Sequence, residues 1–269
     1  NKKDQALLHY NRALELDPNN TRVYRQLGQL YFEMNEKEAA IKQYEKVISI
    51  DPEDVNAYIE LSYMYIALEK IDQALAVLEN ALKLGKREAD VHLTMAFCYS
   101  EKGNKTGAIE EYKKSIEIDP FNPKAYFYLG AALEETGEKE ESIIRLKRSI
   151  ELDPGDPEAL NYLGYIYAEE NKNLDEAESL IKKALSLSPG NGAYTDSLGW
   201  VYFKKGMFEE ARKELEKARA IIGEDPVVYD HLGDVYLKTG SLDKAKEAWI
   251  KSIELKEDKR VKEKLDSLK

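Results

Sequence analysis

The prolines of this chain recur at a fixed interval. Four of them are separated by multiples of 34 residues, and a fifth follows after 35: Pro18, Pro52, Pro120, Pro154 and Pro189. A fixed period of this length is the signature of a repeat architecture, in which one supersecondary unit is copied along the chain. The period therefore constrains the fold more than any local pattern does.

Aligning the chain on this period gives seven copies and two terminal pieces. The segments are 21–54, 55–88, 89–122, 123–156, 157–191, 192–225 and 226–259. The fifth segment carries one extra residue near Lys172–Leu174. Residues 1–20 match the second half of a further copy, and residues 258–269 have the Lys/Glu-rich, weakly apolar pattern of a capping helix. The segments together predict a single superhelical domain.

Each copy has the apolar spacing of two short helices and no pattern typical of a strand. Position eight, counted from Thr21 as position one, holds only small residues: Gly28, Ser62, Ala96, Gly130, Gly164, Gly199 and Gly233. Glycine in a helix interior costs about 1 kcal/mol relative to alanine. Its recurrence at one position predicts that a second helix approaches there too closely for a longer side chain.

These positions resemble the tetratricopeptide repeat, with its bulky–Leu–Gly–Tyr first helix and its Ala–aromatic–Ala–Pro second helix. The resemblance implies an all-α, right-handed solenoid of helix-turn-helix repeats with one continuous core. Within it, Asn161–Trp249 resembles bacterial tetratricopeptide proteins, many of which are envelope lipoproteins. That closer resemblance implies a periplasmic or outer-membrane-tethered protein. A cytoplasmic bacterial scaffold is the alternative.

Composition excludes several functional classes. The chain has 40 Lys and Arg against 51 Asp and Glu, a net charge of −11, which disfavours a protein that neutralises nucleic-acid phosphates. Its apolar runs are much shorter than the roughly 20 residues that a membrane-spanning helix needs. The single cysteine, Cys98, cannot form an intrachain disulfide. We therefore expect no nucleic-acid partner and no membrane insertion by this chain.

No catalytic or cofactor-binding constellation is visible in the sequence. His9, His92 and His231 fall at different repeat positions, so they do not form a metal site or a triad. Cys98 lies between Phe97 and Tyr99 on a predicted first helix and is interpreted as a buried apolar residue. The sequence thus predicts a non-enzymatic protein without a cofactor.

The resemblance places positions two, five, nine, twelve and thirteen of each repeat on a concave groove. The candidate groove residues are Arg22, Arg25, Phe32, Ile59, Tyr63, Ile66, Leu93, Phe97, Phe127, Asn161, Tyr165, Asp196, Trp200, Phe203 and Asp230. Because the repeat core does not need position nine, its aromatic residues are covered either by neighbouring groove side chains or by a partner. The second interpretation predicts a peptide, helix or protein partner with apolar anchors and, since the middle of the groove is acidic, Lys or Arg flanks.

One binding mechanism is not expected of this interaction scaffold, and two alternative functions stay open beside it. The Lys and Asn pattern with which chaperone-binding members of the family clamp a carboxylate is absent, so we do not expect that mechanism. An apolar stripe on residues 1–20, formed by Ala6, Tyr10 and Ala13, suits self-assembly through the N-terminal end. The chain is also compatible with a regulatory repeat region of a larger protein. Partner identity and biological process are not encoded in these positions.

Overall fold

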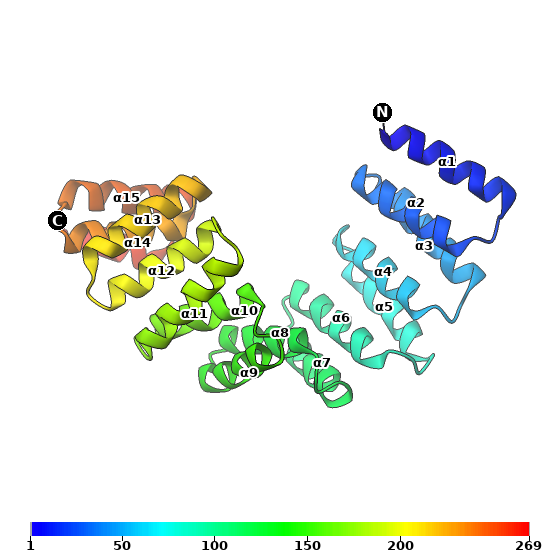
Figure 1. Ribbon diagram of the computed structural model, residues 1–269, viewed down its shortest axis with the longest axis horizontal. Coiled ribbons are helices and arrows are strands. Elements are labelled where there is room, and N and C mark those ends of the chain that lie inside the picture. The colour runs from blue at the N-terminus through cyan, green and yellow to red at the C-terminus, as the bar shows by residue number, and fades with distance from the viewer. Residues whose placement is uncertain (1, 269) are drawn as a thin grey trace. The chain divides into compact units, whose positions relative to one another are not determined.

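A computed structural model describes residues 2–268 of the chain, and the described residues form helices joined by turns, with no strand among them. The helices, in chain order, are α1 (Lys2–Leu16), α2 (Thr21–Glu33), α3 (Lys37–Ile50), α4 (Val55–Ile66), α5 (Ile71–Leu82), α6 (Glu88–Glu101), α7 (Lys105–Ile118), α8 (Pro123–Glu135), α9 (Lys139–Leu152), α10 (Pro157–Glu169), α11 (Leu174–Leu187), α12 (Gly192–Lys204), α13 (Phe208–Ile222), α14 (Pro226–Lys238), α15 (Leu242–Leu255) and α16 (Lys259–Asp266). The predicted all-α solenoid of helix hairpins is confirmed (Figure 1).

The helices group into two compact units (Figure 1). Unit 1 contains the described residues up to Arg145, and unit 2 runs from Leu146 to the last described residue, so the division falls within α9. Inside the units, an even-numbered helix packs against the odd-numbered helix that follows it in the pairs α2–α3, α4–α5, α6–α7, α10–α11, α12–α13 and α14–α15. The even-numbered helices from α2 to α14 are the first helices of the repeats. The predicted organisation as one superhelical domain stays a prediction.

Local sequence determines where the first helices begin and end. Side chains such as Asn20, Asp54 and Asp225 accept hydrogen bonds from the backbone of the first turn, which satisfies donors that have no partner within the helix. The turn inside each hairpin needs the left-handed conformation, which Gly103 adopts with φ +74°. Glu69 adopts it as well, with φ +59°, although its residue type did not suggest it.

Position eight is the place of closest approach inside a hairpin, as the sequence predicts. A Cβ atom on Gly28 would lie 2.8 Å from the ring of Tyr44, and one on Gly164 would lie 2.6 Å from Ile181 Cγ1. The facing residue is at the equivalent place on the second helix in both repeats. In the last complete repeat this residue is Trp249, which lies directly against Gly233.

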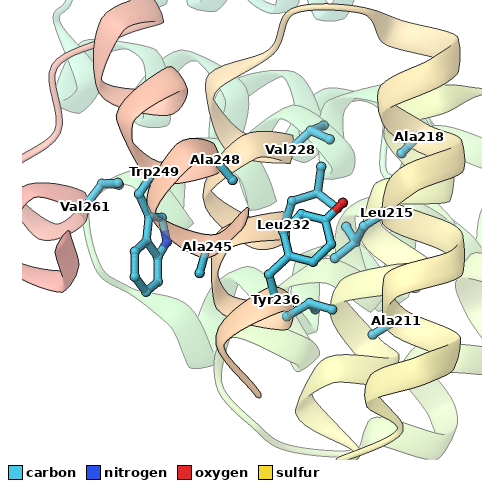
Figure 2. Close-up of a cluster of buried hydrophobic side chains, with 11 residues drawn as sticks. Ala211, Leu215, Ala218, Val228, Leu232, Tyr236, Ala245, Ala248, Trp249 and Val261 are labelled. Atoms are coloured by element: carbon cyan, nitrogen blue, oxygen red, sulfur yellow. The ribbon is translucent and has the colours of Figure 1, made fainter. Parts of the chain in front are cut away.

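Buried apolar residues link each repeat to the next. In unit 2, Leu232 and Tyr236 of α14 lie between Leu215 of α13 and Trp249 of α15 (Figure 2). Val261 of α16 belongs to the same cluster, so α16 packs on this core, while the role of residues 258–269 as a cap stays a prediction. In unit 1, similar clusters follow one another from α3 to α8.

Lysines add a second link between neighbouring repeats in unit 1. Lys3, Lys37 and Lys105 each lie near the start of a second helix, and each donates to a carbonyl at the end of the next first helix, that of Glu33, Ala67 and Glu135 respectively. The donor and acceptor are 30 residues apart in all three bonds. A cation at a helix C-terminus is favourable because the last carbonyls carry a partial negative charge.

Candidate functional site

All candidate groove residues lie on first helices, but the two units use them differently. Unit 1 holds Arg22, Arg25, Phe32, Ile59, Tyr63, Ile66, Leu93, Phe97 and Phe127, and unit 2 holds Asn161, Tyr165, Asp196, Trp200, Phe203 and Asp230. Phe127, Asp196 and Trp200 are buried, whereas Tyr63 is 44% exposed. The structure therefore brings part of the predicted set to an open surface and builds the rest into the protein.

Two adjoining cavities lie along the first helices of unit 1. One, of about 310 Å³, is lined by Ile59, Tyr63 and Leu93 together with polar residues of α4 and α6. The other, of about 320 Å³, is lined by Tyr63, Leu93, Phe97 and Tyr128 and reaches the first turn of α8. We refer to the surface formed by Ile59, Tyr63, Leu93, Phe97 and Tyr128 as the unit-1 trough.

The unit-1 trough has fixed walls and an open aromatic face. Tyr128 stacks on Tyr112 with ring centroids 6.0 Å apart and is still 38% exposed. Ile59 and Leu93 are partly buried and pack on the apolar clusters beneath them. Phe97 is half-buried and lines the second cavity. Packing thus positions the walls, while Tyr63 keeps nearly half of its surface open to a partner.

Several of the N-terminal groove candidates already form ion pairs or apolar contacts within the protein. Arg25 donates to Glu60 of the next repeat at 2.8 Å and to Asp54, the last residue of its own repeat, at 2.5 Å. Burial opposes the charge of Arg25, but these two carboxylates outweigh that effect and raise its pKa. Phe32 and Ile66 pack on apolar clusters. Arg22 is exposed and carries no ion pair within residues 2–268.

In unit 2 the aromatic candidates cover one another. Trp200 lies between Phe203, with ring centroids 4.9 Å apart, and His231, at 4.1 Å, and both pairs are stacked. Its indole Nε1 donates to Glu169, and it is only 7% exposed. Of the two interpretations that the sequence left open for position nine, cover by neighbouring groove side chains therefore applies to Trp200.

Asp196 and His231 form a buried pair that sequence reasoning missed. The His231 ring nitrogen Nδ1 lies 3.0 Å and 3.1 Å from the two carboxylate oxygens of Asp196. Burial disfavours the charged imidazole, but the charge and hydrogen bond of Asp196 outweigh this and raise the pKa of His231. Asp196 is thus already bound by a group of its own chain.

Asp230 is also engaged, by the capping helix. Lys264 of α16 donates to Asp230 and to Asp234, each at 2.7 Å. The three charged candidates at position five each pair with a residue 34 or 35 positions later. Arg25 pairs with Glu60 and Asp196 with His231 on the next first helix, and Asp230 pairs with Lys264 on α16. Opposite charges at that separation are the signal in the sequence that would have identified these pairs.

A cavity of about 280 Å³ remains on this side of unit 2. It is lined by Tyr165, Glu169, Trp200 and His231 and by residues of the last two helices, including Arg260 and Lys264. Acidic and basic groups are mixed in its lining. Asn161 lies on α10, and its Oδ1 atom is buried without a hydrogen-bond partner among residues 2–268.

The remaining candidates for chemistry are dispersed. His92 bonds Glu111, with His92 Nδ1 2.6 Å from Glu111 Oε2, and neither residue lines the cavity of Phe97. Cys98 is buried, as predicted, and burial raises the pKa of its thiol to about 12. Within residues 2–268 no cluster of His, Cys, Asp and Glu has the arrangement of a metal site. No described helix combines the length and apolar character needed to span a bilayer.

Comparisons with solved structures support the fold. A chain of the crystal structure of the APC/C hetero-tetramer Cut9–Hcn1 is 21% identical with a TM-score of 0.75, over 96% of this chain and 51% of that chain. This chain thus spans about half the length of that one. A structure from the functional characterization of Pseudomonas aeruginosa PilF is 21% identical with a TM-score of 0.67, over 80% and 97% of the two chains.

A tetratricopeptide repeat protein from Parabacteroides merdae is 16% identical with a TM-score of 0.67, over 91% of this chain and 97% of that one. At these identities the likeness shows the fold alone. The comparison with curated proteins gave no match.

Family comparisons cover nearly the whole chain. Residues 1–225 match the family described as the cilia and flagella-associated protein 70 C-terminal domain, and residues 227–259 match the tetratricopeptide repeat. Repeats of this kind are in general scaffolds for protein interactions rather than catalysts. The chain therefore belongs to the tetratricopeptide repeat proteins, and through residues 1–225 to the family of the cilia and flagella-associated protein 70 C-terminal domain.

Proposed function

We propose that this protein is an interaction scaffold that holds a peptide or helical segment of a partner protein in the unit-1 trough. The observation that carries the proposal is the pair of adjoining cavities lined by Tyr63, which is 44% exposed. Exposed aromatic residues beside apolar cavities are typical anchoring points for partners. No substrate chemistry is needed for this role.

Unit 2 supports the assignment by contrast. Of its two position-nine aromatic residues, Trp200 is stacked against Phe203 and His231, and the position-five acids are paired with His231 and Lys264. A partner docking there would have to break contacts that already exist. In the unit-1 trough, Tyr63 and Phe97 offer apolar area without that cost.

The test compares partner capture by matched variants of the full chain. Tyr63→Ala/Phe97→Ala removes the open aromatic face, and Phe121→Ala serves as the control because Phe121 is 71% exposed and lines neither cavity. Proteins retained from the source lysate by wild type and Phe121→Ala should be lost from the double variant. Equal retention by all three proteins would show that the trough is not the binding surface.

Self-assembly is a second candidate, favoured by two leucines on α1. Leu8 is 68% exposed and Leu16 is 84% exposed, so α1 presents apolar area that another copy could cover. Sedimentation equilibrium over a wide concentration range distinguishes the two functions. A mass that rises with concentration in wild type and stays constant in Leu8→Ser/Leu16→Ser supports assembly through α1, whereas a constant monomer mass in both excludes it.

A further inference from the structure

Some of the charged side chains around the unit-1 trough form ion pairs within the protein, and others do not. Glu60 accepts from Arg25 at 2.8 Å, and Asp90 accepts from Arg87 at 2.9 Å. Arg87 also donates a hydrogen bond to Asn56, so its guanidinium group contacts two side chains of unit 1. Glu60 and Asp90, the two carboxylates that line these cavities, therefore each already accept a hydrogen bond from an arginine of the same unit.

Lys124 is the exception in this lining. It is exposed, it lines the cavity formed by Tyr63, Leu93, Phe97 and Tyr128, and it forms no ion pair within residues 2–268. It lies in the first turn of α8, where the side chain of Asn122 accepts from the backbone of Lys124 and Ala125. The partial positive charge of that helix end adds to the ammonium charge.

The lining therefore combines the apolar side chains of Tyr63, Leu93 and Phe97 with Lys124, which forms no ion pair within residues 2–268. Each cavity is at the lower end of the range typical for small-molecule sites, about 300–1,000 Å³, which suits a single side chain better than a cofactor. A partner's lysine or arginine would have to compete with Arg25 or Arg87 for a carboxylate. An acidic group would meet Lys124 without displacing anything.

We propose that the unit-1 trough recognises a partner segment in which an apolar side chain stands next to a carboxylate, the apolar side chain filling the cavity of Tyr63, Leu93 and Phe97 and the carboxylate contacting Lys124. This inference rests on the proposed function and specifies the chemistry of the partner. It differs for this unit from the sequence-based expectation of Lys or Arg flanks, which treated the acidic groove residues, Asp90 among them, as unpaired. The Lys124 contact is a solvent-exposed ion pair, so it sets preference more than total affinity.

The experiment selects short random peptides displayed on phage against the full chain. Parallel selections use wild type, Lys124→Glu and Phe97→Ala, with Lys113→Glu as the matched control. Lys113 is an exposed lysine of α7 that lines neither cavity. The selected peptides are then synthesised, and their dissociation constants are measured by fluorescence anisotropy against all four proteins and against Lys124→Ala.

We expect wild-type selections to be enriched in Asp or Glu beside an apolar or aromatic residue. Such peptides should bind Lys124→Ala about two- to five-fold more weakly and Lys124→Glu more weakly still, with no change for Lys113→Glu. Selection against Lys124→Glu should shift the enrichment to Lys or Arg at the same place.

Two results would overturn the inference in different ways. Peptides that require Phe97 but bind wild type and Lys124→Glu equally would contradict the carboxylate preference and leave the proposed function intact. Peptides that bind Phe97→Ala as well as wild type, or the absence of any selected peptide, would contradict the proposed function itself, and the inference would fall with it.

Discussion

Tyr63 in unit 1 and Trp200 in unit 2 occupy the same position of the repeat, yet only one of them belongs to the core. Tyr63 is 44% exposed, whereas Trp200, which is stacked against Phe203 and His231, is 7% exposed. The same difference holds at position five, where Asp196 is buried with His231 while Arg25 forms partly exposed ion pairs. The repeat position thus sets the place of a residue on its helix. Whether the side chain is buried or exposed depends on the residues that pack against it.

At core positions, the side chains of the two units should be buried to the same extent. Leu129 in unit 1 is 1% exposed and Leu198 in unit 2 is 6% exposed, both at position seven. Leu129→Asp and Leu198→Asp each bury an unpaired carboxylate, and we expect each to lower the free energy of unfolding by more than about 4 kcal/mol. Circular dichroism during urea unfolding measures this, and a mild effect in either variant would show that the shared core does not extend through both units.

Substitutions at position five should lower the free energy of unfolding by different amounts in the two units, and both losses should be smaller than those at position seven. Asp196→Ala is expected to lower the free energy of unfolding by about 1.5–3 kcal/mol, because it removes a hydrogen-bonded charge from buried His231. Arg25→Ala should cost only about 0.5–1 kcal/mol, since its partners are partly exposed. Equal losses in the two variants, measured by the same urea titration, would contradict the comparison.

The pH dependence of stability should also differ, through His231. Its folded pKa is raised above the unfolded value because Asp196, Asp230 and Glu169 outweigh the effect of burial. The stabilisation is therefore complete below the unfolded pKa of about 6.5 and is lost as pH rises through the folded pKa. The difference in unfolding free energy between wild type and His231→Gln should shrink from pH 5.5 to pH 9 at about constant ionic strength. A difference that grows with pH would refute the charged pair.

The smallest expected effect is a change in the unfolding midpoint of one unit that leaves the other unit unchanged. Each unit contains its own probe for this measurement. Cys98 is buried in unit 1, whereas both tryptophans, Trp200 and Trp249, lie in unit 2. Its pKa of about 12 makes the Cys98 thiol unreactive toward thiol reagents until its surroundings open. Trp200→Ala should therefore lower the denaturant midpoint seen by Trp249 fluorescence and leave that seen by Cys98 labelling nearly unchanged, since repeats contact only their neighbours. Matching shifts at both probes would show that the units unfold together.

Much of the fold could be predicted from the sequence because the repeat constrains it many times over. Position eight is an example: small residues there imply a close neighbour, and Tyr44 lies against Gly28 as expected. The left-handed turn at Glu69 was not predictable from residue type, but its register in the repeat requires it.

The candidate site could be predicted only in part. Its residues do lie on first helices, but a single-position pattern does not show which side chain of the next repeat will cover them. Trp200 appeared available because His231 was considered alone, not as the residue that follows Asp196 by 35 positions. Lys124 was weighed only within a sum of charges, and its importance appears when the carboxylates around it are found to be paired.

The most direct measurement compares urea unfolding of wild type, Tyr63→Ala and Trp200→Ala by far-ultraviolet circular dichroism. Trp200→Ala should lower the free energy of unfolding by about 3–5 kcal/mol, as expected for removing a buried aromatic side chain. Tyr63→Ala should change it by no more than about 0.5 kcal/mol, as expected for a surface substitution. If Tyr63→Ala destabilised the protein as much as Trp200→Ala, the trough aromatic would belong to the core, and an open binding surface in unit 1 would be contradicted.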